Sequence, residues 1–135
     1  MVRSPLYVKF VTIAGSLCYV GWGVFHIGVA NDIRHIGLMQ SGIAQGRTFQ
    51  LAAYMLCIAL FAIITALVGN WRNQRLAYWL NLCVIGWADA VWVAVVVAPG
   101  YVPLFRGLVP PFIYLLGAAL TSLARSSWLK APAGR

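Results

Sequence analysis

Acidic residues are almost absent from this 135-residue chain, which has ten Lys and Arg but only two acids, Asp32 and Asp89. Charged residues make up 9% of the sequence, whereas a soluble domain uses about 25% to cover its surface. Hydrophobic residues make up 62%, and the mean hydropathy is +0.85. This composition excludes a soluble cytosolic enzyme and indicates a chain that folds in lipid.

Several functional motifs are also missing. The three cysteines have no CxxC or Cys/His spacing, so they predict neither a zinc site nor disulfide exchange, and we expect buried packing residues. The absence of a Gly-rich phosphate loop, a nucleophilic serine motif and a lysine deep in an apolar run excludes nucleotide-driven and retinal-based functions. The only histidines are His26 and His35, and together with the two aspartates they are the strong metal ligands of the chain. Asp89 is predicted to lie deeper in the membrane than the others, so the sequence predicts no metal site, haem or other cofactor.

Four apolar segments are each long enough to cross a bilayer, which takes about 20 helical residues. They cover residues 8–30, 48–69, 76–98 and 104–124. They predict an all-α fold, an integral membrane four-helix bundle that forms a single domain over residues 1–135. A cleavable signal peptide ending near residues 28–30 is the alternative for the first segment, although that segment exceeds the roughly 7–15 apolar residues usual for a signal peptide.

Two connections carry structural information. The 17-residue segment 31–47 is longer than a helical hairpin needs, so we expect either a lid over the outer mouth or a short amphipathic helix on the membrane surface. Pro110 and Pro111 start or kink the fourth helix, which predicts irregular backbone over residues 104–109.

The net charge of +8 indicates membrane orientation and not nucleic-acid binding, because the basic residues fall between the apolar runs. Seven basic residues are predicted on one side and three on the other. The seven are Arg3, Lys9, Arg72, Arg75, Arg125, Lys130 and Arg135, and the three are Arg34, Arg47 and Arg106. By the positive-inside rule both termini are cytoplasmic, in a multi-pass protein of, we expect, the bacterial inner membrane.

Each apolar segment carries a stripe of polar and aromatic residues at helical spacing, which predicts a polar-lined bundle interior. The stripes are Thr12, Ser16, Tyr19, Gly23 and His26; Gln50, Tyr54, Cys57, Phe61 and Thr65; Tyr78, Asn81, Ile85, Asp89 and Trp92; and Pro111, Tyr114, Ala118, Thr121 and Arg125. Aliphatic side chains are left to face lipid.

Asp89 is the acidic residue within a predicted span. A carboxylate near the bilayer centre costs roughly 2.5–3.5 kcal/mol, and burial without a cation favours its neutral, protonated form. We therefore interpret Asp89 as a catalytic proton donor. The alternative is that it holds the helices together through hydrogen bonds to tyrosine hydroxyls, worth about 0.6–2 kcal/mol in membranes.

The other candidate residues form two layers around Asp89. Tyr19, Tyr54 and Tyr114 are predicted at its depth, as catalytic residues that orient the acid or a substrate oxygen. His26 lies further out as a proton relay, with an interfacial structural histidine as the alternative. Aromatic and amide side chains are predicted to bind the ligand, unless they are plain packing. These are Trp22, Trp92, Gln50 and Asn81.

The segment Gly21-Trp22-Gly23-Val24-Phe25-His26-Ile27-Gly28 closes the first of four spans whose termini lie on one side. In this patch and in its hairpin layout the chain resembles the small DoxX-like membrane proteins. The resemblance implies a four-helix bundle associated with membrane redox chemistry, often as a small subunit near quinones. Asp89 and the tryptophan-rich third span depart from that pattern.

Three functions fit these observations. The first is an acid/base enzyme for a lipophilic substrate, such as an isomerase, a cyclase or an epoxide-opening enzyme, centred on Asp89. The second is a non-catalytic DoxX-like subunit or a module that binds quinone or lipid. The third is a proton-coupled transporter. The expected partners are membrane lipid, a lipophilic small molecule, and a second copy or another membrane protein.

Overall fold

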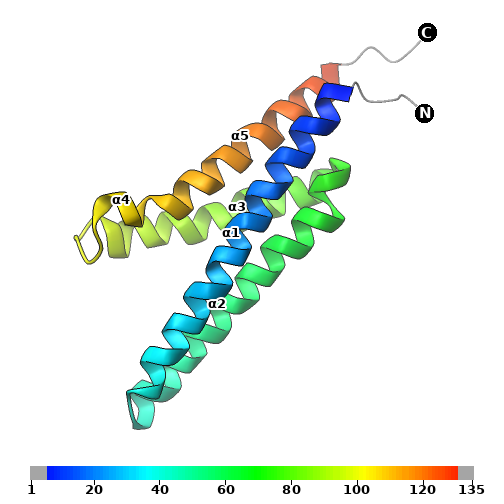
Figure 1. Ribbon diagram of the computed structural model, residues 1–135. Helices are drawn as coiled ribbons and strands as arrows, with labels where there is room; N and C mark the ends of the chain where they lie inside the picture. Colours follow the sequence, from blue (N-terminus) through cyan, green and yellow to red (C-terminus); the bar gives the residue numbers. More distant parts are fainter. Residues whose placement is uncertain (1–5, 131–135) are drawn as a thin grey trace.

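The computed structural model describes residues 6–130, and the side chains of residues 6–127. The described chain is all-helical, as predicted, and Figure 1 shows the arrangement of its elements. In order they are α1 (Leu6–Leu38), α2 (Gly42–Val68), the 3₁₀ turn η1 (Asn70–Arg72), α3 (Arg75–Trp92), the π-helix η2 (Val93–Val97), α4 (Leu104–Gly107) and α5 (Val109–Lys130). Four helical segments within this part of the chain are long and apolar enough to cross a membrane, as in a multi-pass membrane protein.

The helices form two arms (Figure 1). One arm is the hairpin of α1 and α2, and the other contains α3, α4 and α5. The arms meet near the end at which α1 begins and α5 finishes, and they diverge toward the opposite end. Helix α1 packs against both α2 and α5, so it is the central helix of the structure.

Glycines of α1 allow this close packing. A Cβ atom at Gly23 would lie 2.6 Å from the Ile63 side chain and 2.8 Å from the Ala59 carbonyl oxygen of α2. On the α5 side, a Cβ atom at Gly15 would lie 2.8 Å from Thr121. Small residues at such positions let two backbones approach, which is the usual way membrane helices associate.

Three of the four predicted interior stripes are oriented as expected. The stripe residues of α1 are buried, and those of α3 and α5 are buried or half-buried. The prediction for α2 is wrong, because Gln50, Tyr54 and Cys57 are exposed. The buried residues of α2 are alanines, namely Ala52, Ala59, Ala62 and Ala66. Alanine side chains are small enough for the backbone of α2 to approach α1 closely, whereas the larger polar side chains of α2 point away from α1.

The connection between α1 and α2 is much shorter than predicted. Helix α1 continues to Leu38 and α2 starts at Gly42, so the lid and the surface helix predicted for residues 31–47 are both wrong. The hairpin remains tightly packed near its tip, where a Cβ atom at Gly37 would lie 2.7 Å from the Phe49 ring. With 33 residues, α1 is about 50 Å long, compared with about 30 Å for the hydrocarbon core of a bilayer.

The backbone of the second arm is irregular at the end farther from the first arm, as the prolines predict. Helix α4 is a single turn, and Pro110 and Pro111 lie in the first turn of α5, where a missing N–H breaks no helical hydrogen bond. The Trp92 indole Nε1–H donates to the Gly107 carbonyl oxygen at 2.8 Å. This bond joins the end of α3 to α4.

Candidate functional site

The centre of the candidate site is a hydrogen bond between the two arms. The indole Nε1 of Trp22 on α1 lies 3.2 and 3.1 Å from the two carboxyl oxygens of Asp89 on α3 and donates to them. The exposed fractions of these two residues are 1% and 4%. A buried carboxyl group without a partner would destabilise the fold, and the indole N–H supplies that partner.

His26 stacks on the same indole. Its ring centroid lies 3.7 Å from that of Trp22, with an angle of 24° between the ring planes. The ring Nδ1 lies 2.8 Å from the Trp22 carbonyl oxygen. Because a carbonyl oxygen can only accept, Nδ1 carries the proton, which leaves Nε2 as the acceptor of the neutral ring. Trp22 therefore positions both an acid and a base.

Two of the predicted tyrosines lie in the core beside this pair, but neither is the partner of Asp89. Tyr19 is fully buried, and its hydroxyl has no hydrogen-bond partner within residues 6–127. The Tyr114 ring lies 6.3 Å from the Tyr19 ring, and its hydroxyl donates to the Leu82 carbonyl oxygen at 2.9 Å. The structure thus pairs Asp89 with an indole where the sequence suggested tyrosine hydroxyls.

The remaining predicted site residues are dispersed. Tyr54 is 57% exposed, and its hydroxyl accepts a hydrogen bond from the side-chain amide of Gln50, on the face of α2 that points away from α1. Trp92 is half-buried and bonded to α4. Asn81 is fully buried, and both polar atoms of its side chain lack a partner in the described part of the chain. It lies eight residues before Asp89 on α3, which is about 12 Å.

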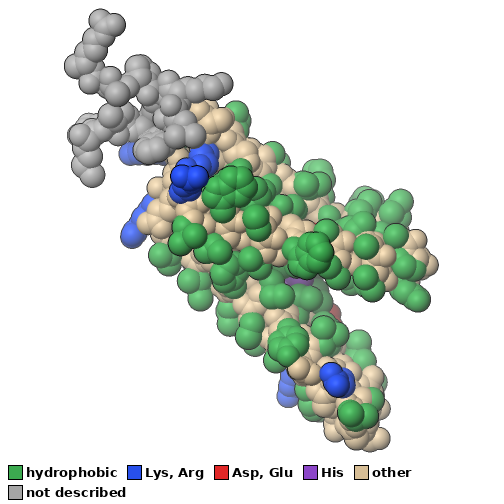
Figure 2. All heavy atoms as spheres, turned by 180° about the vertical axis from the view of Figure 1, so that it is seen from behind, with side chains coloured by type: hydrophobic (Ala, Val, Ile, Leu, Met, Phe, Trp, Pro, Cys, Tyr) green, Lys and Arg blue, Asp and Glu red, His purple; other side chains and the backbone are tan. Residues whose placement is uncertain are grey.

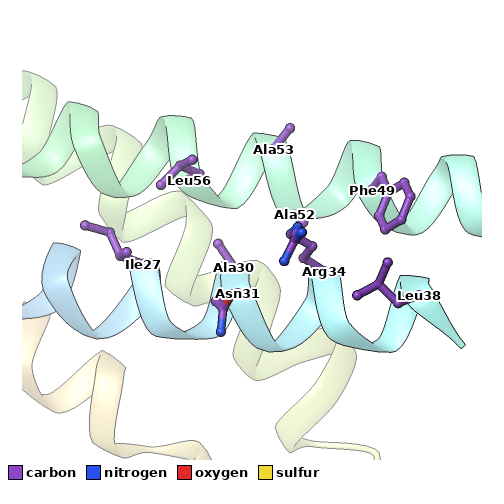
Figure 3. Close-up of a pocket in the computed structure, with 9 residues that line it drawn as sticks. All are labelled: Ile27, Ala30, Asn31, Arg34, Leu38, Phe49, Ala52, Ala53 and Leu56. Atoms are coloured by element: carbon purple, nitrogen blue, oxygen red, sulfur yellow. The ribbon is translucent and has the colours of Figure 1, made fainter.

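A cavity of about 680 Å³ lies along the outer halves of α1 and α2 (Figure 3). On α1 its lining runs from Ile27, the residue after His26, through Ala30, Asn31 and Arg34 to Leu38. Phe49 and Leu56 of α2 lie across from these residues. The cavity is therefore largely apolar, with one cation and one amide on its α1 side.

The sequence does not reveal this cavity, because the polar residues of 31–47 predict a loop. It also assigned Trp22 to a pocket wall without pairing it with Asp89. The signal that was present is the spacing of Trp22, His26 and Ala30, which repeats every four residues and continues the buried face of α1.

The molecular surface agrees with a membrane environment. On the face shown in Figure 2, hydrophobic side chains cover the middle of both arms, while Lys and Arg side chains lie toward the ends. A hollow separates the arms on this face. The expectation of buried cysteines is wrong for Cys57 and Cys83, which are exposed, whereas Cys18 is half-buried. Within the described residues, no three His, Cys, Asp or Glu side chains form a group that could hold a metal ion.

No protein-family model, curated protein or solved structure matches this chain. The similarity to DoxX-like proteins stays a prediction from the glycine, aromatic and histidine patch of the first span. In that patch Gly23 and His26 are buried, and Gly21 and Gly28 have open space beside them.

Proposed function

We propose that this chain is a membrane-embedded protein that binds a lipophilic molecule with an oxygen-containing polar group and performs acid/base chemistry on it. One observation carries the proposal. The buried carboxyl group of Asp89 and the imidazole of His26 are held by the same indole, and a largely apolar cavity of about 680 Å³ begins at Ile27, the residue after His26, although none of the three side chains lines it. An acid and a base of different type, held close to an apolar cavity, are the arrangement that proton transfer to a lipophilic substrate requires.

In this proposal Asp89 is the proton donor. A neutral carboxylic acid can accept the indole N–H on one oxygen and donate its own proton from the other to a substrate oxygen. His26 accepts a proton at Nε2 and relays it outward. Trp22 orients both groups. The reaction class is isomerisation, cyclisation or epoxide opening, since each of these needs a proton delivered to one atom and removed from another.

The proposed orientation places both termini in the cytoplasm of a bacterial cell, with the chain in the inner membrane. Basic residues support this orientation, because Lys9, Arg72, Arg75 and Arg125 belong to the end of the molecule where α1 begins, η1 turns and α5 finishes. Arg34, Arg47 and Arg106 belong to the opposite ends of the arms. The side with more Lys and Arg is normally cytoplasmic.

The direct test is mass spectrometry of the small molecules extracted from the purified wild-type protein, from Asp89→Asn and from Asp32→Asn. Asp32 is the matched control, because it is the other acid of the chain and is exposed on α1. We expect a lipophilic molecule in the wild-type protein and in Asp32→Asn, and a changed or missing molecule in Asp89→Asn. Empty protein in all three samples, with Asp89→Asn less stable, would instead make Asp89 a packing residue.

A second candidate function is a non-catalytic subunit of a membrane complex, as the DoxX-like resemblance implies. The observation that favours it is the exposed polar face of α2, which contains Gln50, Tyr54 and Cys57 near the middle of that helix. Polar side chains in the bilayer usually face protein. Oxidative cross-linking through Cys57 in native membranes, with Cys18 and Cys83 replaced by Ser, tests this: a cross-linked product supports a partner at this face, and unmodified monomer contradicts it.

A further inference from the structure

A second cavity lies at the end of the molecule opposite to the hairpin tip. Its volume is about 330 Å³, and it is formed by the first turns of α1 and by the turn between α2 and α3. Two cations line it, Lys9 from α1 and Arg72 from η1. Trp71 and Asn73 complete the side formed by the turn. The cavity is thus basic and is built from two separate parts of the chain.

The acids of this protein cannot neutralise these two cations. Asp32 lies 23 residues beyond Lys9 on the same helix, which is about 35 Å. Asp89 bonds to Trp22, which is itself about 20 Å along α1 from Lys9. The two positive charges therefore share a cavity that no Asp or Glu side chain reaches, and an anion from outside the chain would be attracted to it.

The turn also offers a hydrogen-bond donor. The side-chain nitrogen of Asn73 is buried and has no partner within residues 6–127. Its backbone is held in the left-handed region, with φ at 55°, and its N–H donates to the Asn70 carbonyl oxygen at 2.8 Å. The Thr12 hydroxyl is already used, because it donates to the Val8 carbonyl oxygen at 2.7 Å. The available donors are therefore those of Lys9, Arg72 and Asn73.

The cavity lies at the level of the molecule where lipid headgroups are expected. Trp71 is 42% exposed at the place where the second apolar helical segment ends at Arg72 and the third starts at Arg75. Tryptophan is enriched at this level of membrane proteins, at the boundary between hydrocarbon and water. A basic cavity between helices at this level is typical of sites for anionic lipid headgroups.

We propose that this cavity binds the phosphate group of an anionic phospholipid, with Lys9 and Arg72 as the charged contacts and Asn73 as a neutral donor. The site is separate from Asp89 and does not depend on the function proposed for it. Free inorganic phosphate has the same chemistry as the headgroup but lacks acyl chains, so the two sources can be distinguished experimentally.

The test is native mass spectrometry of the full chain in micelles containing equal amounts of phosphatidylglycerol and phosphatidylcholine. The variant Lys9→Gln/Arg72→Gln removes both cations of the cavity. The matched control is Arg47→Gln/Arg106→Gln, which removes the same charge from residues that line neither described cavity. We expect the wild-type protein and the control to retain more phosphatidylglycerol than phosphatidylcholine. In the cavity variant this preference should fall roughly 5-fold for each cation removed.

Three results would overturn the proposal. The first is equal retention of the two lipids by the wild-type protein, which needs no variant. The second is an equal loss of preference in both double variants, because net charge alone would then explain it. The third is thermal stabilisation of the wild-type protein by inorganic phosphate in phosphatidylcholine micelles that equals its stabilisation by phosphatidylglycerol. Single variants Lys9→Gln and Arg72→Gln provide the same comparison if the double variant does not fold.

Discussion

Helices α1 and α2 carry polar stripes with similar spacing, yet one stripe is buried and the other is exposed. Helix α1 contacts α2 and α5, and Trp22 bonds to α3, so every side of its stripe has a neighbour. Helix α2 lies at the edge and buries alanines against α1. Polar residues at helical spacing therefore show that a helix has a polar face. Whether that face is buried depends on how many neighbouring helices pack around the helix.

The two stripes also satisfy their polar groups differently. In α1 the Thr12 and Ser16 hydroxyls donate to carbonyl oxygens one turn earlier, at 2.7 and 2.8 Å, so they need no partner on another helix. In α2 Gln50 and Tyr54 bond to each other on the exposed side. The α1 stripe can therefore be packed tightly, and the α2 stripe can stay outside this bundle.

The largest effect is expected for the residue that connects α1 to the second arm. Trp22→Phe removes the indole N–H and leaves the buried Asp89 without its partner, which costs about 1–3 kcal/mol, and the smaller ring adds a packing loss. We expect the free energy of unfolding, measured by SDS titration in mixed micelles, to fall by about 3 kcal/mol. Trp87→Phe is the control, since Trp87 is 73% exposed. Equal stability of the two variants would contradict the role of the hydrogen bond.

A smaller loss is expected at the interface between the two compared helices. A Cβ atom at Gly23 would contact the Ala59 carbonyl oxygen at 2.8 Å, so Gly23→Ala must separate α1 from α2 and should cost about 1–3 kcal/mol in the same titration. Gly21→Ala is the matched control, because nothing lies within 4 Å of a Cβ atom there. That substitution should be neutral or stabilising by up to about 1 kcal/mol. The prediction fails if the two variants are equally stable.

The smallest effect is expected on the exposed stripe. Tyr54→Phe and Gln50→Leu remove the polar pair of α2 without opening the core, so the unfolding free energy of the monomer should change by no more than about 0.5 kcal/mol. A loss above about 1 kcal/mol at a protein concentration where only monomer is present would show that this stripe packs within the bundle. A change that appears only at high protein concentration would indicate a partner at this face.

Much of the fold could be predicted from composition and spacing. The apolar segments, the buried stripes of α1, α3 and α5, and the interrupted helix before Pro110 and Pro111 follow from local rules. The continuous helix beyond residue 30 is not predicted, because the polar residues Asn31, Asp32, Arg34 and His35 are typical of a loop. No Gly or Pro interrupts residues 29–36, and their absence was the better guide.

The candidate site was only partly predictable. Asp89 and His26 were identified from the cost of polar groups in lipid, which is a local property. The bond from Trp22 to Asp89 joins residues 67 positions apart, and it depends on how the arms cross. The outward orientation of Tyr54 depends in the same way on which neighbours α2 has. Neither can be obtained from the periodicity of a single helix.

The length of α1 also determines where the larger cavity opens. A helix of about 50 Å that tilts by 40°, near the upper limit seen for membrane helices, spans only about 38 Å along the membrane normal. In the proposed membrane orientation, α1 is therefore longer than the hydrocarbon is thick, and the last turns of the hairpin extend beyond it. With Lys9 at one boundary, Arg34 then lies close to the other. In that orientation the α1 lining of the cavity, from Ile27 to Leu38, runs from the hydrocarbon to the boundary, so a bound lipophilic molecule would keep its polar end near Arg34.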